Sequence, residues 1–318
     1  MAGPEAGVST VAVIGLGTMG AGIAAVLARS GMTVRGCDVS AGAIEATRLK
    51  LPAIAGVLDD LGVPAKGSAT DVVLTDTLED AVADADLVIE NVPEELDLKR
   101  AVLDSIAGHV SETCILASDT SGIPISRLQE GLPSPGRVVG MHWSNPPHII
   151  PVVEVVAGDE TSVDTVEWMM ASVRRLNLIP VRVKRDVPGF VENRILYAVM
   201  REALDLVERG VVDAEDLDTC VSWGIGYKLA VVGPMSLLDM AGLDIYGSVA
   251  GYLNRDLCSR GDVSPWAEEK IASGRLGLKT GEGIYAYHQD EAASLGAARA
   301  RRLVAVRRAL DASGEGEP

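Results

Sequence analysis

The stretch that decides the fold runs from Val11 to Asp38 and reads VAVIGLGTMGAGIAAVLARSGMTVRGCD. A short apolar run ends in a glycine-rich turn, an apolar segment with helical spacing follows, and a second apolar run ends in an acid. Gly31, between the last two segments, is typical of a helix C-terminus. The pattern predicts a strand, a helix and a second strand, the unit from which parallel sheets are built.

The turn holds Gly15, Gly17 and Gly20 at G-x-G-x-x-G spacing, with Thr18 and Met19 inside it. The first glycine permits a tight turn, the second lets the backbone approach a pyrophosphate, and the third lets helix and strand pack closely. Because the motif follows a predicted strand and opens a predicted helix, it indicates a dinucleotide site that includes all five residues.

The residue that selects the dinucleotide is Asp38, 18 residues after Gly20 at the end of the second predicted strand. A carboxylate there accepts hydrogen bonds from the ribose hydroxyls and repels a 2′-phosphate. No arginine follows it in DVSAGA. The sequence therefore predicts NAD, and not NADP, as the cofactor.

The rest of the chain changes character near residue 186. Before it lie further short apolar runs separated by helical patterns: DVVLTD, ADLVIENV, TCILASDT, GRVVGMH, IPVVEVVAG and LIPVRVKRD. After it the patterns are helical, beginning with the long segment FVENRILYAVMREALDLVERG. We predict an α/β domain with a Rossmann-type doubly wound sheet over residues 1–185, followed by an all-α domain over residues 186–318.

The composition of the chain excludes several classes of binding partner. The chain has 318 residues, 47% of them hydrophobic, and a formal net charge of −17, which disfavours nucleic acid and anionic membranes. Neither a signal peptide nor an apolar run of transmembrane length is found. The four cysteines do not have metal or redox spacing, so no metal is expected. We expect a cytoplasmic protein.

The segment GMHWSNPPHIIPVVEVV, Gly140–Val156, carries two histidines and a lone acid among valines. If its ends are strands joined by the Asn-Pro-Pro loop, His142 faces Glu154 while His148 lies on the loop. A carboxylate beside an imidazole orients the ring and stabilises its protonated form, which suits a general base. The alternative is a structural histidine and an exposed glutamate, and spacing alone does not decide between them.

The same segment resembles the His-x-x-Asn-Pro motif of the 3-hydroxyacyl-CoA dehydrogenases, in which a Glu follows after the same gap. Further segments resemble other motifs of that family, and the resemblance covers residues 10–288: VPEELDLK, SDTSGIPIS, DVPGFVENRI, GPMSLLDMAGLD and GLKTGEGIYAY. It implies a homodimeric enzyme that uses NAD to oxidise the C3 hydroxyl of a 3-hydroxyacyl-CoA substrate reversibly to the 3-oxo product.

The resemblance also implies roles for single residues. His142 would be the general base and Glu154 its partner, Ser121 would hydrogen-bond the reacting oxygen, and Asn193 would hold the carbonyl end of the substrate. On the cofactor side, the corresponding residues are Glu94, Lys99 and Asn145.

Several positions depart from the family pattern. Asp59 and Asp60, with only Lys66, stand where the acyl-CoA enzymes carry clustered lysines, and Asp119 replaces an Asn beside the substrate. WGIGYKLAVVGP is longer than usual, as in relatives that act on L-gulonate or carnitine. A free or carrier-bound polar 3-hydroxy acid is therefore the alternative substrate.

Two other classes of protein are alternatives to this family. Dehydrogenases of short β-hydroxy acids use a lysine on the long helix that opens the second half, and the segment that starts at Phe190 has none. An NAD-binding structural or sensor protein is the non-enzyme alternative, but it has no need of an intact set of Ser121, His142, Glu154 and Asn193.

Overall fold

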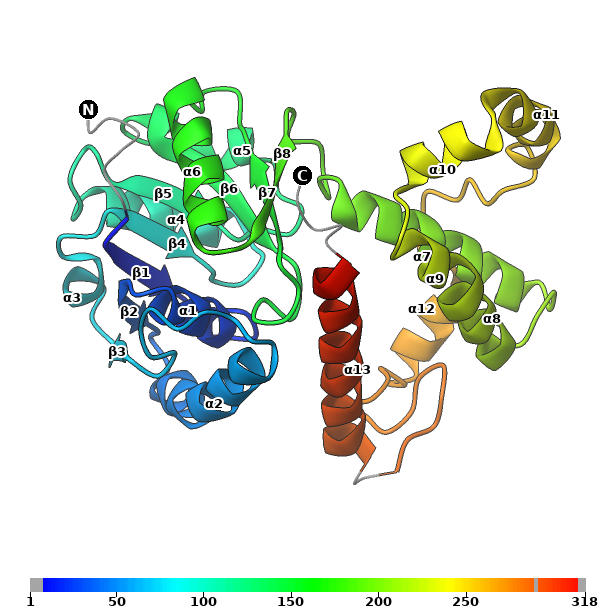
Figure 1. The fold of residues 1–318 in the computed structure, drawn as a ribbon, viewed down its shortest axis with the longest axis horizontal. Helices are drawn as coiled ribbons and strands as arrows, with labels where there is room; N and C mark the ends of the chain where they lie inside the picture. The colour runs from blue at the N-terminus through cyan, green and yellow to red at the C-terminus, as the bar shows by residue number, and fades with distance from the viewer. Residues whose placement is uncertain (1–7, 289–290, 314–318) are drawn as a thin grey trace. The chain divides into compact units, whose positions relative to one another are not determined.

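The computed structural model describes residues 8–288 and 291–313, and an eight-stranded sheet forms the centre of its N-terminal unit (Figure 1). The strands are β1 Thr10–Ile14, β2 Thr33–Cys37, β3 Val72–Thr75, β4 Leu87–Glu90, β5 Ile115–Ser118, β6 Val138–Trp143, β7 Val152–Val156 and β8 Ile179–Val183. The sheet belongs to a compact unit that contains the residues up to Asn193 and the short stretch Leu303–Arg308.

The order of the strands is β3-β2-β1-β4-β5-β6-β7-β8. All neighbours pair in parallel except β6 and β7, which are antiparallel. The chain proceeds outward from β1 in one direction and then from β4 in the other, so the crevice between β1 and β4 is the switch point at which such sheets bind ligands. The predicted doubly wound Rossmann-type fold is confirmed.

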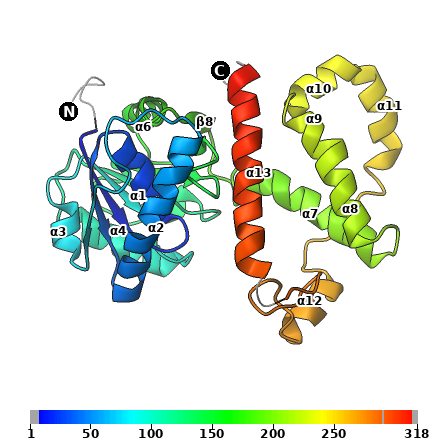
Figure 2. The ribbon, with the colours of Figure 1, turned by 60° about the horizontal axis from the view of Figure 1, so that its bottom comes forward.

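Two hydrophobic cores lie on the two faces of the sheet, as the alternation in β1 shows. Val11 and Val13 pack into one core, while Ala12 and Ile14 pack into the other. The helices of the first core are α1 Gly20–Arg29, α2 Ala41–Asp60 and α6 Val163–Arg175, and Figure 2 shows α1 and α2 side by side. The second core is covered by α3 Leu78–Val82, α4 Leu96–Ala107 and α5 Ile125–Gln129, and the 3₁₀ turn η1 Pro135–Arg137 precedes β6.

The register of β6 places the candidate site. Gly140 is the last residue of β6 that pairs with β5, opposite Ser118, so Met141 to Trp143 extend past the end of β5. The antiparallel partner β7 pairs with this extension, and His142 lies opposite Glu154. The turn that follows Ser118 therefore runs beside the end of β6, because both leave the same edge of the sheet.

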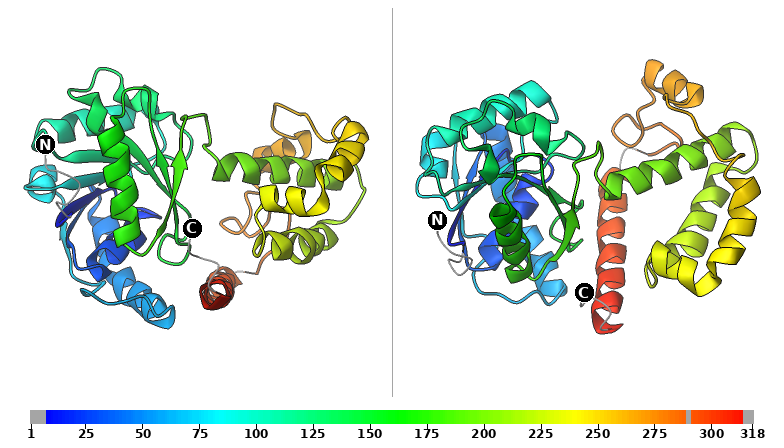
Figure 3. Two further views of the ribbon diagram at one scale, coloured as in Figure 1. Left: turned by 45° about the horizontal axis from the view of Figure 1, so that its top comes forward. Right: turned by 90° about the horizontal axis from the view of Figure 1, so that it is seen from above.

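The second compact unit contains Arg194–Arg302 and the end of the last helix. Its helices are α7 Glu192–Glu208, α8 Ala214–Cys220, the π-helical turn η2 Val221–Gly226, α9 Tyr227–Leu229, α10 Pro234–Ala241, α11 Leu243–Leu253, α12 Pro265–Ala272 and α13 Glu291–Ser313. Figure 3 shows helices and connecting loops in this part of the chain, where the only described β structure is a pair of isolated bridges at Glu282. The chain passes from one unit to the other inside α7.

Within the described residues, no single helix has the length and apolar character needed to cross a membrane, although the bent pair Ala214–Leu229 and Pro234–Ala241, with 84° between its members, meets that test jointly.

Candidate active site

The glycine-rich turn has the geometry that a dinucleotide requires. Gly15 has φ +100°, and a Cβ there would lie 2.4 Å from the Asn91 carbonyl oxygen. A Cβ on Gly20 would lie 2.2 Å from the Gly15 oxygen, whereas a Cβ on Gly17 would meet nothing within 4 Å. Two of the glycines are therefore needed for packing, and the third leaves open space at the N-terminus of α1, where a pyrophosphate binds in such folds.

Asp38, immediately after β2, holds this turn in place through a hydrogen bond. Its Oδ2 accepts a hydrogen bond of 2.8 Å from the Leu16 backbone N–H, and its Oδ1 accepts one of 2.8 Å from Ser40. Across the switch point, Asn91 Nδ2 donates to the Gly15 oxygen at 3.2 Å. The carboxylate is therefore held beside the turn, and its remaining lone pairs suit ribose hydroxyls. The exposed Thr18 and the half-buried Met19 follow in the same turn.

His142 and Glu154 are in direct contact. The ring Nδ1 lies 2.7 Å from Glu154 Oε2, and both side chains are almost fully buried, at 7% and 2% exposed. An ionised carboxylate accepts the proton on Nδ1, so we assign Nε2 as the ring nitrogen that accepts a proton from outside. This is the arrangement of a general base with an orienting acid.

Glu154 is also bound at the start of α7. Its Oε1 accepts hydrogen bonds from the backbone N–H groups of Val191 and Glu192, at 3.0 and 3.1 Å. Burial raises the pKa of Glu154, but the hydrogen bonds from His142 and the two N–H groups outweigh it, so the pKa is lowered overall. Burial lowers the pKa of His142, and the bond to Glu154 with the charge of Asp119 reverses this to a net increase. The pair therefore holds an ionised acid next to an imidazole that is easily protonated.

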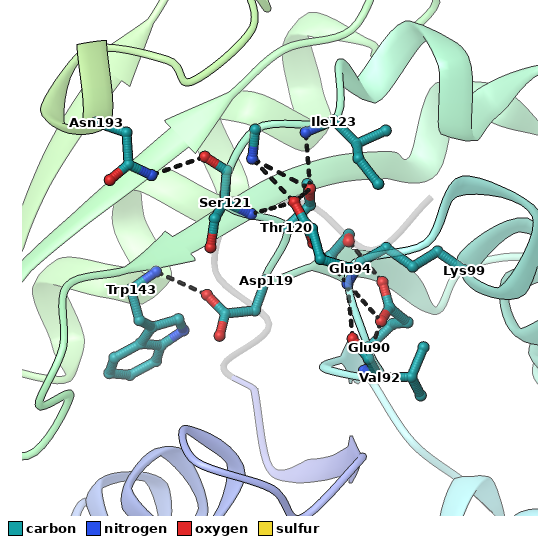
Figure 4. A network of polar contacts seen from close by, with 12 residues as sticks. Glu90, Val92, Glu94, Lys99, Asp119, Thr120, Ser121, Ile123, Trp143 and Asn193 are labelled. Atoms are coloured by element: carbon teal, nitrogen blue, oxygen red, sulfur yellow. Dashed lines mark hydrogen bonds and ion pairs between the residues drawn. The ribbon is translucent and has the colours of Figure 1, made fainter. Parts of the chain in front are cut away.

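Ser121 lies on the turn after β5 and Asn193 in the first turn of α7. Asn193 Nδ2 donates to the Ser121 backbone oxygen at 2.8 Å (Figure 4). A neighbouring bond joins Ser144 Oγ, just past β6, to the Glu192 carboxylate. The structure therefore brings Ser121 and Asn193 together, and it ties the start of α7 to both loops of the site.

Lys99 joins the buried Glu90 to the exposed Glu94 in a polar network (Figure 4). Lys99 is only 1% exposed, and its Nζ lies 2.9 Å from Glu90 Oε1, 3.1 Å from the Val92 oxygen and 3.4 Å from Glu94 Oε2. The first two contacts are hydrogen bonds and the third is an ion pair, so Lys99 links the two acids. Burial raises the pKa of Glu90, although Lys99 opposes it.

Glu94 fixes the turn that carries Ser121. Its Oε1 accepts from Thr120 Oγ1 at 2.7 Å and from the backbone N–H groups of Ser121 and Gly122 at 2.9 and 3.1 Å. A carboxylate with three donors is strongly oriented. The sequence resemblance placed Glu94 beside the cofactor but did not predict its hydrogen bonds to this turn. Backbone N–H donors cannot be recognised in a sequence, because almost every residue has one.

Asn145 and His148 lie on the loop between β6 and β7. Asn145 is exposed, as expected of a residue that contacts a ligand. His148 packs against α1, where a Cβ on Gly22 would lie 3.1 Å from its Nδ1. Burial lowers the pKa of His148, and its Nδ1 has no hydrogen-bond partner among the described residues. His148 is therefore a neutral, packed histidine, unlike His142.

Comparison with protein families decides the classification. The model of the 3-hydroxyacyl-CoA dehydrogenase NAD-binding domain matches residues 10–187, and the model of the C-terminal domain of 3-hydroxyacyl-CoA dehydrogenase matches residues 189–287.

The chain belongs to the 3-hydroxyacyl-CoA dehydrogenase family. It is an NAD-dependent dehydrogenase of that family, and the match to its NAD-binding domain confirms the prediction of NAD as the cofactor.

Within the family, the chain is 56% identical to 5-formyl-3-hydroxy-2-methylpyridine 4-carboxylate 5-dehydrogenase of Mesorhizobium japonicum, over 96% of this chain and 99% of the relative. A crystal structure of an enzyme with this activity, described as an NAD⁺-dependent dismutase, matches it with a TM-score of 0.93 at 56% identity, covering 96% and 99% of the two chains. L-carnitine dehydrogenase of Nocardiopsis dassonvillei is 36% identical over 97% and 93%.

Substitution of Gly17 by alanine tests the pyrophosphate position. The added methyl group meets no protein atom within 4 Å, so we expect unchanged thermal stability. It would stand in the space left for the cofactor, and we expect the Kd for NADH to rise roughly tenfold. Gly56→Ala is the matched control, because its Cβ also meets nothing within 4 Å but lies in α2. Equal NADH affinities in fluorescence titrations of both variants would contradict the assignment.

Replacement of Asp38 by alanine tests the ribose contact. We expect weaker NADH binding and a smaller preference for NADH over NADPH, since the charge that repels a 2′-phosphate is gone. Kinetics with both cofactors measure the ratio, and a melting curve separates this effect from loosening of the turn that Asp38 fastens at Leu16. An unchanged preference would rule out the role.

The His142→Gln variant tests the base. The amide keeps a donor for Glu154 but cannot take up a proton, so kcat should fall by about 10²- to 10⁴-fold while NADH binding persists. In the wild type, kcat/KM for oxidation should rise with pH through the raised pKa of His142, because the neutral ring is the base. His109→Gln is the control, since His109 pairs with Glu79 at the surface. Retained turnover in His142→Gln would disprove the assignment.

Proposed function

We propose that this protein uses NAD⁺ to oxidise the formyl group of a small aromatic carboxylate, 5-formyl-3-hydroxy-2-methylpyridine-4-carboxylate, to a carboxylate, and that it also dismutates this aldehyde. The observation that carries the proposal is the 56% identity to a dehydrogenase of that compound over nearly the whole length of both chains. The TM-score of 0.93 to a dismutase of the same compound supports it.

The chemistry needs only the base that the family already has. An aldehyde in water adds a water molecule and becomes a hydrate, whose carbon bears a hydroxyl group and a hydrogen, like C3 of a 3-hydroxyacyl group. His142 Nε2 takes the proton of that hydroxyl, while Glu154 stabilises the imidazolium that forms. NAD⁺ supplies the hydride acceptor in oxidation, and NADH the hydride donor in reduction.

The two half-reactions balance. In the first, the hydrate loses a hydride to NAD⁺ and a proton to His142, which leaves the carboxylic acid and NADH. In the second, another aldehyde molecule takes the hydride from NADH and a proton from His142, which leaves the alcohol and NAD⁺. The sum converts two aldehydes and one water into one acid and one alcohol, so the base is returned to its starting state.

We assign the remaining residues by their contacts. Ser121, on the turn fixed by Glu94, hydrogen-bonds the reacting oxygen. Asn193 keeps that turn at the start of α7 through its bond to Ser121, and its second amide proton is available to the substrate. Lys99 acts through Glu94 and Glu90 rather than on the cofactor, since it is buried and paired with both acids.

The acyl-CoA thioester predicted from the family resemblance is the second candidate, and the family match favours it. The surface of α2 counts against it. This helix ends at Asp59 and Asp60, and Asp59 already holds Arg29 through an ion pair of 2.6 Å. A phosphate-rich handle calls for free positive charge, whereas the cations at this end of α2 already bind the protein: Arg29 pairs with Asp59, and Arg308 donates to the Asp60 backbone oxygen. A free polar 3-hydroxy acid is the third candidate, favoured by the likeness to L-carnitine dehydrogenase.

We propose that the protein is a homodimer through its helical unit. No residue of α7 to α11 is buried in the single chain. Large apolar side chains are exposed there, among them Tyr197 at 69%, Trp223 at 75% and Met240 at 75%. Apolar surface of this extent calls for a covering partner, and a second copy of the same chain is the usual one.

A substrate panel tests the proposed reaction. NADH formation is followed with 5-formyl-3-hydroxy-2-methylpyridine-4-carboxylate, 3-hydroxybutyryl-CoA, free 3-hydroxybutyrate, L-gulonate and L-carnitine. We expect the aldehyde to give the highest kcat/KM, and chromatography to detect acid and alcohol when catalytic amounts of NAD⁺ are supplied. The His142→Gln variant is the matched blank. Activity confined to the thioester would contradict the proposal and support the acyl-CoA assignment.

A further inference from the structure

Asp119, the first residue after β5, is a buried acid of the site without an assigned task. Its Oδ1 accepts a hydrogen bond of 2.8 Å from the Trp143 backbone N–H, and Trp143 follows His142 in β6. Figure 4 shows the second oxygen, Oδ2, turned away from that bond. Oδ2 has no hydrogen-bond donor in the described part of the chain, and Asp119 keeps 7% of its surface exposed.

The charges that act on Asp119 come from three neighbouring elements. His142 on β6 and Lys99 on α4 favour its ionised form, while Glu90 on β4 opposes it. Burial is the largest effect and raises the pKa of Asp119 to about 7, because hydrogen bonding and the two cations compensate it only in part. Asp119 in turn helps to raise the pKa of His142. Because each group shifts the pKa of the other, His142 and Asp119 titrate as a coupled pair.

Because one side-chain oxygen binds the Trp143 N–H, Asp and Asn at this position differ in the second atom that is left for a ligand. An asparagine here, the residue of the family motif, would need its amide oxygen for the Trp143 N–H, so its outward atom would be an NH₂ group, which only donates. With Asp119 the outward atom is an oxygen, which accepts a hydrogen bond when ionised. The substitution thus replaces a donor with an acceptor next to His142.

We propose that Asp119 is a second catalytic residue, whose Oδ2 accepts a hydrogen bond from the second hydroxyl group of the hydrated aldehyde. The proposal rests on the proposed function, since an alcohol substrate has one hydroxyl at the reacting carbon and a hydrate has two. His142 takes the proton of one hydroxyl, and the C–O bond of that group becomes the new carbonyl as the hydride leaves to NAD⁺. Asp119 orients the other hydroxyl and takes its proton as the acid product ionises.

The Asp119→Asn variant separates this role from packing. It keeps an acceptor for Trp143, replaces the outward oxygen with an NH₂ group and removes the charge that helps to raise the pKa of His142. Oxidation and reduction are therefore compared at their pH-independent limits, where a shifted pKa of His142 has no effect. We expect kcat/KM for aldehyde oxidation to fall about 10- to 100-fold, the effect of losing one hydrogen bond to a charged group. Reduction of the same aldehyde with NADH should change much less, because the unhydrated aldehyde has no second hydroxyl. NADH affinity and the melting temperature serve as controls.

Each outcome decides. Equal losses in oxidation and reduction would show that Asp119 only supports the structure, and unchanged oxidation would show that it does not touch the hydrate; either result overturns the proposal. A wild-type enzyme that does not oxidise the aldehyde overturns the proposed function as well. If the wild-type enzyme oxidises the aldehyde and Asp119→Asn has the same ratio of oxidation rate to reduction rate as the wild type, only the role of Asp119 is overturned.

A second measurement uses the wild-type enzyme and tests the proposal even where Asp119→Asn does not fold. Oxidation requires a neutral His142 and an ionised Asp119, so log kcat/KM for the aldehyde should rise with pH with a limiting slope of about two. Reduction requires a protonated His142 and should fall as pH rises. A limiting slope of one for oxidation would mean that a single group titrates, and it would refute the second base.

Discussion

The carboxylate of Glu154 on β7 joins three elements of the chain, because it also binds the neighbouring strand β6 and the start of α7. One oxygen holds the ring of His142 from the neighbouring strand, and the other accepts two backbone N–H groups at the start of α7. Burial of an isolated carboxylate costs several kcal/mol, and this one is tolerated because the imidazole and the positive end of a helix both favour its charge. The orientation of the predicted base therefore depends on where α7 begins, although α7 lies outside the sheet.

The turn after β5 is held in an analogous way from the other side. Glu94 gathers Thr120, Ser121 and Gly122, and it is anchored by the buried Lys99, which also binds Glu90. Removing Glu90 or Lys99 would leave the other as an uncompensated buried charge, so these two residues are mutually dependent. His142 and Ser121 are thus positioned by two separate acids, and the space between them is fixed by the sheet edge that carries both.

Sequence reasoning reached the fold because the deciding features are local. The glycine turn, the eight short apolar runs and the change of pattern near Asp186 each depend on neighbours in the chain. The contact of His142 with Glu154 was also within reach, since a short loop joins their strands and only one acid lies among the valines. In both cases spacing along the chain limits what the fold can bring together.

The parts that sequence reasoning missed depend on distant contacts. The family resemblance named Lys99 as a cofactor-side residue, but nothing in its helix indicated that the structure buries it between Glu90 and Glu94. The short run that ends in Glu90 held a signal, because an acid at the end of an otherwise apolar strand needs a partner. The backbone donors that Glu94 and Glu154 bind left no such signal, since every residue except proline has an N–H group.

The motif that identifies the family does not identify the substrate, and the chemistry explains why. An alcohol and a hydrated aldehyde present the same hydroxyl and the same hydrogen to the base and the cofactor, so His142 and Glu154 are required equally for both. The two substrates differ in the second oxygen on the reacting carbon, and only residues that reach that oxygen can distinguish them. Asp119 binds the Trp143 N–H through Oδ1 and leaves Oδ2 for a ligand, whereas an asparagine bound in the same way would leave an NH₂ group. In the proposed role of Asp119, the bond to Trp143 therefore decides which side-chain atom is left for the second oxygen of the substrate.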